Sequence, residues 1–448
     1  MLNQTNRRLA ITTIVLSVFA VMPAVGQTIT EDHKLQRRFG HSHDNFGETI
    51  AIDDGIVAIG ASGVGNNSGA AFLFDASTGD QLFTLQTTSG SAEDRFGFSI
   101  AIDNGIVAVT AISDDDNGPR SGAAYLFDAS NGQQIAKLIA SDGSYNDQFG
   151  SSIAIDNGIV AVGAYQDDDN GEDSGSAYLF DVSTGAQIAK LLPDDGAAFD
   201  LFGRTIDIDN GIVAVTARDS FEGSAYLFDA STGEQLFKLI PTDGEDRDQF
   251  GHGIAIEDGI VAVGAPRDDD NGTDSGSVYL FNASSGEQVD KLLANDGGLQ
   301  DRFGRSVAIE NGVLAVGAWG EFDDNGPHTG SAYLFDVSTG LQIAKLLASD
   351  GEEIDKLGTS IAIDNGIVAA GADGDDDLAN ESGSAYVFTT PHFCSADLNA
   401  DGIFNFFDVS TFIVSIANNT PLADLNNDAQ WDFSDVSLFM QSASAGCP

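Results

Sequence analysis

Residues 149–191 read FGSSIAIDNGIVAVGAYQDDDNGEDSGSAYLFDVSTGAQIAKL. Four short apolar segments follow one another in this stretch, at residues 152–155, 159–164, 176–180 and 187–191. Asn157-Gly158 separates the first two, and Asn-Gly favours a two-residue hairpin because both positions tolerate positive φ. The β-branched residues and glycines disfavour a helix. The stretch therefore predicts four antiparallel strands in succession.

The same pattern recurs along most of the chain. A Phe-Gly pair opens six units, and Leu357-Gly358 opens a seventh, with successive spacings of 50, 53, 53, 48, 53 and 54 residues. The phenylalanines of these pairs are Phe46, Phe96, Phe149, Phe202, Phe250 and Phe303. Four-stranded units at this period are typical of propeller blades, which bury both faces by stacking. We predict an all-β, seven-bladed β-propeller over residues 27–391; the alternative, a parallel β-helix, usually has much shorter repeats.

The two ends of the repeat region predict how the ring closes. The seventh unit ends after its third strand, near Phe388, and lacks a fourth. His33-Lys34-Leu35 resembles the Ala-Lys-Leu of the other fourth strands. We therefore expect residues 28–36 to complete the last blade, which would remove exposed sheet edges.

The units resemble FG-GAP repeats, the blades of integrin α-chain propellers and of many bacterial surface proteins. Besides the Phe-Gly pairs, the matching residues are Gly-Ala pairs, and Gly264-Ala265-Pro266 carries the full motif. Units two and four have Thr110-Ala111 and Thr216-Ala217 instead. The resemblance covers about residues 40–390. It implies a propeller, and extracellular binding functions that are diverse within the family.

Acidic residues recur at two places in each unit. An aspartate stands two residues before every Phe-Gly position, which predicts a structural acceptor for backbone N–H groups rather than a catalytic group. The integrin-type calcium hairpin is too short here to form a calcium site. Later loops such as Asp167–Asp169 could offer oxygen ligands to calcium; the alternative is a solvated acidic loop.

The N-terminal segment is typical of a secretory signal peptide. Arg7 and Arg8 precede a short apolar run, and a small-residue cleavage pattern follows, so we expect residues 1–26 to be removed. The mature chain would then carry a net charge of −52, against −50 for the whole sequence. This acidity argues against nucleic acid and anionic membranes as partners. No later segment predicts a membrane-spanning helix.

A second domain begins after Pro391, at residues 392–448. Two loops place oxygen-bearing side chains at calcium-ligand spacing, with Gly402 at the sharp turn of the first and Ala429 in that place of the second. The predicted calcium ligands are Asp397, Asn399, Asp401, Ile403 through its carbonyl, Asn405 and Asp408, then Asp424, Asn426, Asp428, Gln430 through its carbonyl, Asp432 and Asp435. Cys394 and Cys447 flank this segment, and we expect them to form a disulfide in an exported protein.

Each loop precedes an expected helix, at residues 409–416 and 436–442, and the duplicated loops ending in Asp resemble a dockerin. The resemblance implies a small α-helical, calcium-dependent domain that binds a cohesin-like scaffold protein. We therefore expect a secreted or cell-surface adhesion or interaction protein, with a propeller that binds an extracellular protein or glycan. The alternative is an extracellular polysaccharide lyase or glycoside hydrolase. We predict no enzyme, because no catalytic motif stands out and the blades look nearly uniform.

Overall fold

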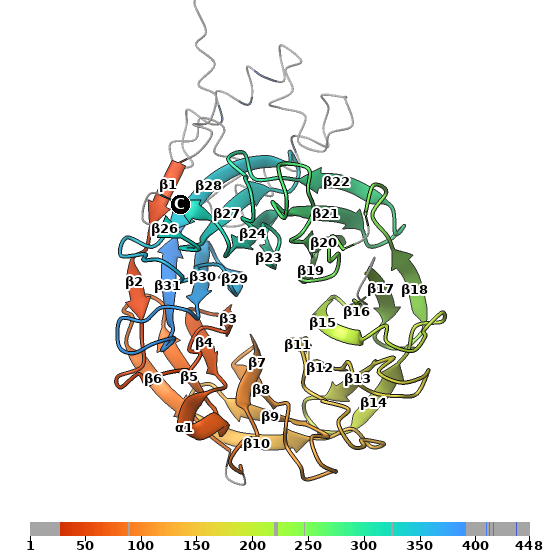
Figure 1. Cartoon of the computed structure of the whole chain (residues 1–448). Coiled ribbons are helices and arrows are strands. Elements are labelled where there is room, and N and C mark those ends of the chain that lie inside the picture. Colours follow the sequence, from red (N-terminus) through yellow and green to blue (C-terminus); the bar gives the residue numbers. More distant parts are fainter. Residues whose placement is uncertain are drawn as a thin grey trace, which may run out of the picture.

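The computed structural model describes residues 27–87, 90–218, 223–245, 247–323 and 326–390, together with Val409, Phe412, Ser415 and Val436. The propeller region is a closed ring of seven blades around a central axis (Figure 1). Each blade has four antiparallel strands, which run outward in chain order in six blades, whereas the outermost strand of the seventh comes from the N-terminal segment. The prediction of a seven-bladed, all-β propeller is therefore confirmed.

The strands occupy equivalent positions in the seven blades. The innermost strands are β3 (Thr49–Asp53), β7 (Phe96–Asp103), β11 (Ile153–Asp156), β15 (Phe202–Asp209), β19 (Ile254–Glu257), β23 (Ser306–Glu310) and β29 (Ile361–Asp364). The second strands are β4 (Ile56–Ala61), β8 (Ile106–Ala111), β12 (Ile159–Ala164), β16 (Ile212–Ala217), β20 (Ile260–Ala265), β24 (Val313–Ala318) and β30 (Ile367–Ala372). The third strands are β5 (Ala70–Asp75), β9 (Ala123–Asp128), β13 (Ser176–Asp181), β17 (Ser224–Asp229), β21 (Ser277–Asn282), β27 (Ser331–Asp336) and β31 (Ser384–Thr389). The outermost strands are β6 (Gln81–Leu85), β10 (Gln133–Leu138), β14 (Gln187–Leu191), β18 (Gln235–Leu239), β22 (Gln288–Leu292), β28 (Leu341–Leu347) and β2 (His33–Leu35).

The predicted hairpins join the first and second strands. Asn157 and Gly158 have φ values of 47° and 81°, so both central residues lie in the left-handed region, and the other blades repeat this turn. The turns between third and fourth strands lie at the same end of the ring, which we name the hairpin face. The loops between second and third strands and the connections between blades lie at the opposite end, the loop face.

Each blade has one face of large side chains and one of small side chains. In the third blade Val162, Tyr178 and Phe180 pack toward the second blade. Ala161, Ala177 and Leu179 alternate with them and pack toward the fourth blade. Seven such apolar clusters fill the seven blade junctions, so a blade buries its apolar surface only between two neighbours.

The Gly-Ala and Phe-Gly pairs meet across the blade junctions. A Cβ atom on Gly163 would lie 2.0 Å from the carbonyl oxygen of Gly203 in the next blade. The same approach closes the ring, where a Cβ on Gly371 would lie 2.0 Å from the carbonyl oxygen of Gly47. Only glycine permits backbones to approach this closely.

The N-terminal segment closes the ring, but not entirely as predicted. β2 pairs antiparallel with β31, with Lys34 opposite Tyr386, so His33–Leu35 completes the seventh blade as expected (Figure 1). β1 (Gln27–Thr30) instead pairs in parallel with β28 of the sixth blade. The expectation that residues 28–30 belong to the last blade is therefore wrong. β28 offers an unpaired outer edge, and Ile29 packs against the cluster between blades six and seven.

Other elements are minor. A short turn of helix, α1 (Val64–Asn67), occupies the first blade's loop between second and third strands, and the two-residue strands β25 (Phe322–Asp323) and β26 (Gly326–Pro327) occupy that of the sixth. In the described part of the chain, no helix has the length and apolar character needed to cross a membrane. The predicted signal peptide, disulfide and calcium loops lie outside the described residues. Val409, Phe412, Ser415 and Val436 are helical and fall within the two helices expected in the tail.

The closing strand should carry a measurable share of the stability. Leu35 is fully buried in the cluster between blades seven and one, so Leu35→Ala should lower the free energy of unfolding by about 3 kcal/mol. Leu82→Ala is the matched control, because Leu82 is 41% exposed in an outermost strand. Urea denaturation of the two variants measures the difference, and equal losses would contradict closure by β2.

Candidate functional site

The aspartates before the Phe-Gly positions are structural, as predicted. Each accepts a hydrogen bond from the backbone N–H three residues earlier, at 2.5–2.7 Å. The seven residues are Asp44, Asp94, Asp147, Asp200, Asp248, Asp301 and Asp355. They shape the connections between blades and hold no common centre, so they are not a catalytic set.

The acidic loops enclose a lysine ammonium group. In the third blade, Lys190 Nζ lies 2.8 Å from Asp142, 3.0 Å from Asp167 and 2.7 Å from Asp169. Tyr178 donates its hydroxyl hydrogen bond to the buried Asp167 at 2.9 Å, and Lys190 Nζ lies over the same ring. Burial alone would lower the pKa of Lys190, but the three carboxylates outweigh it and raise that pKa.

Six blades repeat this arrangement of lysine, tyrosine and carboxylate. The lysines and their acidic partners are Lys34 with Asp350, Asp375 and Asp377; Lys137 with Asp114 and Asp116; Lys190 as above; Lys238 with Asp195; Lys291 with Asp243, Asp268 and Asp270; and Lys345 with Asp296 and Glu321. The first blade has Phe72 and Thr84 at the tyrosine and lysine positions. In four of these loops the first aspartate is buried and paired with the lysine, rather than solvated; these are Asp114, Asp167, Asp268 and Asp375.

Among the residues that the structure describes, no three histidine, cysteine, aspartate or glutamate side chains form a group that could hold a metal ion. The twelve predicted calcium ligands of the tail lie outside the described residues.

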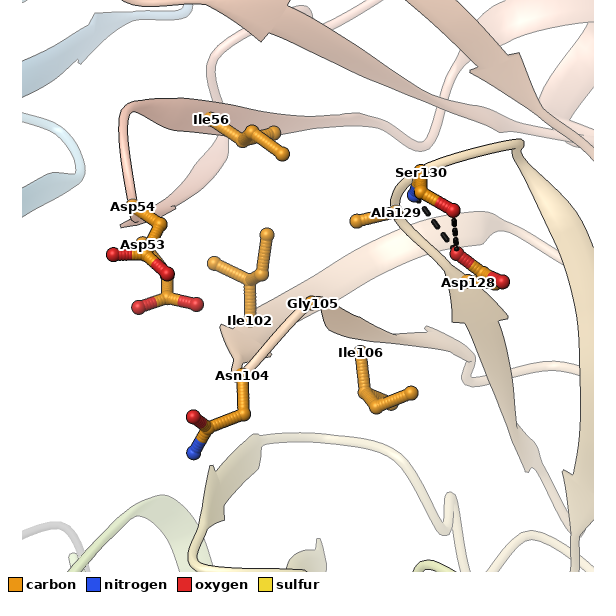
Figure 2. Close-up of a pocket in the computed structure, with 10 residues that line it drawn as sticks. All are labelled: Asp53, Asp54, Ile56, Ile102, Asn104, Gly105, Ile106, Asp128, Ala129 and Ser130. Carbon is orange, nitrogen blue, oxygen red and sulfur yellow. Dashed lines mark hydrogen bonds between the residues drawn. The ribbon is translucent and has the colours of Figure 1, made fainter.

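The hairpin face carries a shallow pocket between the first two blades (Figure 2). It has a volume of about 400 Å³, with Ile56, Ile102 and Ile106 on its walls and Asp53 and Asp54 at one side. Asp128 accepts hydrogen bonds from the backbone and hydroxyl of Ser130 beside it, at 2.9 and 2.6 Å. Because other blades repeat this turn, the pocket is a by-product of blade stacking rather than a singular site.

Two sets of residues that differ from blade to blade lie on the loop face, beside the inner strands. They follow the Phe-Gly and Gly-Ala pairs, and we name the two sets together the inner rim. After Phe-Gly stand Glu48, Phe98, Ser151, Arg204, His252, Arg305 and Thr359; after Gly-Ala stand Ser62, Ile112, Tyr165, Arg218, Pro266, Trp319 and Asp373. Basic residues occupy one part of this rim, in blades four to six, and Glu48 and Asp373 occupy blades one and seven.

The basic part of the rim is a connected cluster. Arg305 and His252 contact each other through the guanidinium and imidazole Nε2, and His252 Nδ1 lies 3.1 Å from the carbonyl oxygen of Arg305. Arg204 stacks on Tyr165 with 4.8 Å between guanidinium carbon and ring centroid, and Arg302 stacks on Trp319 at 4.5 Å. The name arginine cluster is used below for Arg204, Arg218, Arg302 and Arg305 together with His252.

The cluster's electrostatics reflect burial and mutual repulsion. Burial lowers the pKa of Arg218 to about 10, and Arg204, Arg305 and Arg267 add to the effect. Burial also holds the pKa of His252 well below 6.5, helped by Arg305 and Arg218. The imidazole is therefore neutral at pH 7, donating through Nδ1 to the Arg305 carbonyl and accepting at Nε2.

Sequence reasoning missed this cluster. It treated the blades as nearly uniform, which holds for their cores and turns but is wrong for the inner rim. The signal was present: aligning the seven units and reading only the residue after each pair places Arg204, His252 and Arg305 in consecutive blades. The sequence does not show that these three residues are neighbours, because only the stacking of the blades brings them together.

Comparison with known proteins agrees with the repeat. A family model described as FG-GAP repeat matches seven segments, at residues 30–74, 84–127, 133–180, 186–228, 234–281, 287–335 and 341–388. Each segment runs from the outer strand of one blade through the third strand of the next, so the repeat unit is offset from the blade by one strand. No curated protein matches the chain.

The lysines should stabilise the ring without metal. Lys190→Met leaves the carboxylate of Asp167, 5% exposed, without its counter-ion, and should cost about 3 kcal/mol of unfolding free energy. Lys356→Met is the control, since no carboxylate within the described residues forms an ion pair with Lys356; it should change stability by less than about 0.5 kcal/mol. Chemical denaturation of both variants provides the test, and a loss no larger for Lys190→Met would refute the role.

The buried acceptors should make stability depend on pH. Burial, with repulsion from Asp375, raises the pKa of Asp355 from 3.8 to about 7, and burial raises that of Asp147 to about 6. Between pH 4 and 7 the folded chain therefore holds protons that the unfolded chain has released, so stability should fall as pH rises through this window. Melting curves across the window should show a shallower slope for Asp355→Asn.

The control for charge alone is Asp194→Asn, at an exposed residue in the connection between blades three and four. It should leave the slope of melting temperature against pH unchanged. Identical slopes in the wild type and both variants would exclude Asp355 as a source of the effect.

Proposed function

Because the chain belongs to the FG-GAP repeat family, we propose that it is an extracellular interaction protein whose propeller binds a partner on its loop face. In this proposal the partner is an extracellular protein or glycan. The tail, residues 392–448, folds around two calcium ions and attaches the propeller to a cohesin-like scaffold protein. The protein is secreted or held at the cell surface, and the propeller has no catalytic role.

One observation supports the binding role above others. The seven blades repeat their cores and turns, and six of them repeat the acid–lysine group, whereas the inner rim changes residue from blade to blade. A rigid ring with variable residues beside its inner strands is suited to presenting a binding surface. FG-GAP propellers are typical of extracellular proteins that bind other molecules, which agrees with this assignment.

The second candidate is an extracellular polysaccharide lyase or glycoside hydrolase. The singular set of Arg204, Tyr165 and His252 favours it, because such an enzyme needs a group of residues that the other blades lack. Both imidazole nitrogens of His252 are already engaged by Arg305, however, so the histidine has no free nitrogen for a substrate proton. The binding role is therefore preferred.

The proposed calcium sites rest on ligand spacing in the tail. Asp397, Asp401 and Asp408 recur as Asp424, Asp428 and Asp435 in the second loop. Carboxylates this close in sequence repel one another until a cation binds, so calcium binding should be coupled to folding of the tail.

Calcium titration of the intact mature chain tests the tail. Isothermal titration should detect two sites, and Asp397→Ala combined with Asp424→Ala should abolish them. Asp169→Asn in the propeller is the matched control and should leave both sites intact, because Lys190 is the cation of that loop. Calcium binding lost in the control but retained in the tail variant would refute the assignment.

A panel of extracellular polysaccharides separates binding from catalysis. Each polysaccharide is incubated with the mature chain, and both retention on the polymer and release of reducing ends or unsaturated products are measured. Retention without products is expected. Release of products in proportion to the concentration of the mature chain would overturn the binding role in favour of the second candidate.

A further inference from the structure

Positive charge is scarce in this chain, and it is concentrated. The sequence has 19 basic against 69 acidic residues, and six of its seven lysines are neutralised inside the blades. Of the twelve arginines, four belong to the arginine cluster. Arg267 lies close enough to Arg218 to lower the pKa of Arg218. This part of the loop face is therefore electropositive in an otherwise acidic protein.

Within the described residues the arginine cluster forms no ion pair with a carboxylate, and Asp373 and Glu48 act on Arg305 only as more distant charges. In this part of the chain, Arg37 is the arginine that forms an ion pair, with Asp44. Among the described residues, Arg218 has one long hydrogen bond, 3.4 Å to the side-chain oxygen of Gln249, and Arg302 Nε is buried without an acceptor. Asp219 and Glu222, which follow Arg218 in sequence, lie outside the described residues. The four arginines are half-buried, and guanidinium groups that are partly removed from water with few acceptors gain strong hydrogen bonds from an incoming anion.

The guanidinium groups are held in place before any ligand arrives. Tyr165 and Trp319 support the flat faces of Arg204 and Arg302, so the N–H groups at their edges remain available as donors. The Tyr165 hydroxyl is itself fixed by a 2.7 Å hydrogen bond to Gln148. Pre-organised side chains lose little conformational freedom on binding, which favours affinity.

We propose that the arginine cluster binds an acidic saccharide, with a carboxylate or sulfate group held by Arg204, Arg218 and Arg305 and sugar rings beside the rim residues Tyr165 and Trp319. This inference rests on the proposed binding function and specifies its ligand. Arginine forks match the planar geometry of a carboxylate, and the amide nitrogen of Gln249, whose oxygen accepts from Arg218, offers a hydrogen bond to a hydroxyl group.

The surrounding charge favours a saccharide over an acidic protein. Exposed carboxylates such as Asp168, Asp269 and Asp376 surround the inner rim on the loop face. An acidic protein surface would meet these like charges across a wide contact, which opposes binding. A narrow glycan chain can reach the arginine cluster with few acidic groups, and salt screens repulsion from charges more than about 8 Å away.

The test compares matched ligands on the intact mature chain. Titration calorimetry is run with an oligogalacturonate and with its fully methyl-esterified form, which keeps the sugars but removes the charge, and likewise with a sulfated galactan oligosaccharide and its desulfated form. We expect the charged member of at least one pair to bind and its neutral counterpart to bind at least about tenfold more weakly. Inorganic sulfate and a glutamate oligopeptide serve as the remaining ligands and should bind more weakly than the acidic saccharide.

Variants locate the site. Arg204→Gln and Arg218→Gln should each weaken saccharide binding about tenfold or more. Arg120→Gln, at an exposed position in a loop of the same face, removes the same charge and should leave affinity within about twofold. Arg204→Lys keeps the charge but loses the fork, and should fall between wild type and Arg204→Gln. Melting curves confirm that each variant is folded, and Arg218→Gln is the decisive variant if Arg204→Gln unfolds.

Several results would overturn the inference. Equal binding of charged and neutral saccharides, an equal loss in Arg120→Gln, or preference for the glutamate peptide or for sulfate alone would each do so. If another partner binds the propeller and the arginine variants leave that binding unchanged, the inference fails while the proposed function stands. If no ligand is retained and products are released, the proposed function fails instead.

Discussion

The whole structure depends on how one blade packs against the next. Each sheet presents large side chains such as Tyr178 and Phe180 on one face and small ones such as Ala161 and Ala177 on the other. The face with large side chains packs against the face with small side chains of the neighbouring blade only when all blades have the same orientation. Repeating this contact closes the blades into a ring. Glycine at Gly163 and Gly203 lets the backbones meet, so the aromatic side chains are fully enclosed. No blade could bury both faces alone.

The extreme acidity of the chain is handled locally. The first aspartate of an acidic loop is buried, which would be costly without a counter-ion, and a lysine of the fourth strand supplies one together with a tyrosine hydroxyl. These groups use nearly all the lysines for structure. Four of the arginines lie together in blades four to six instead. One side of the ring is therefore positively charged, although the chain as a whole is acidic. A positively charged patch of this kind attracts anionic ligands and repels cationic ones.

Much of the architecture follows from short-range sequence rules. The hairpin at Asn157-Gly158, the buried third strand and the aspartate before each Phe-Gly pair all have local causes and were predictable. The position of β1 was not, because a parallel strand on the edge of β28 leaves no local pattern in four residues. The lysine in each acidic loop was also missed. Lys190 and Asp167 are 23 residues apart, and only the pairing of outer strands brings them together.

The sequence by itself determined the number of blades, the order of strands within them and the source of the closing strand, because turn chemistry and alternating burial act over a few residues at a time. The tertiary structure alone decided which residues share a site. Arg204, His252 and Arg305 are about fifty residues apart in sequence. They become neighbours only because the inner strands of successive blades lie side by side and all start at the loop face. The stacking of the blades brings basic residues at equivalent positions of successive blades into one positively charged surface. Charge interactions depend on distance in space and not on distance along the chain.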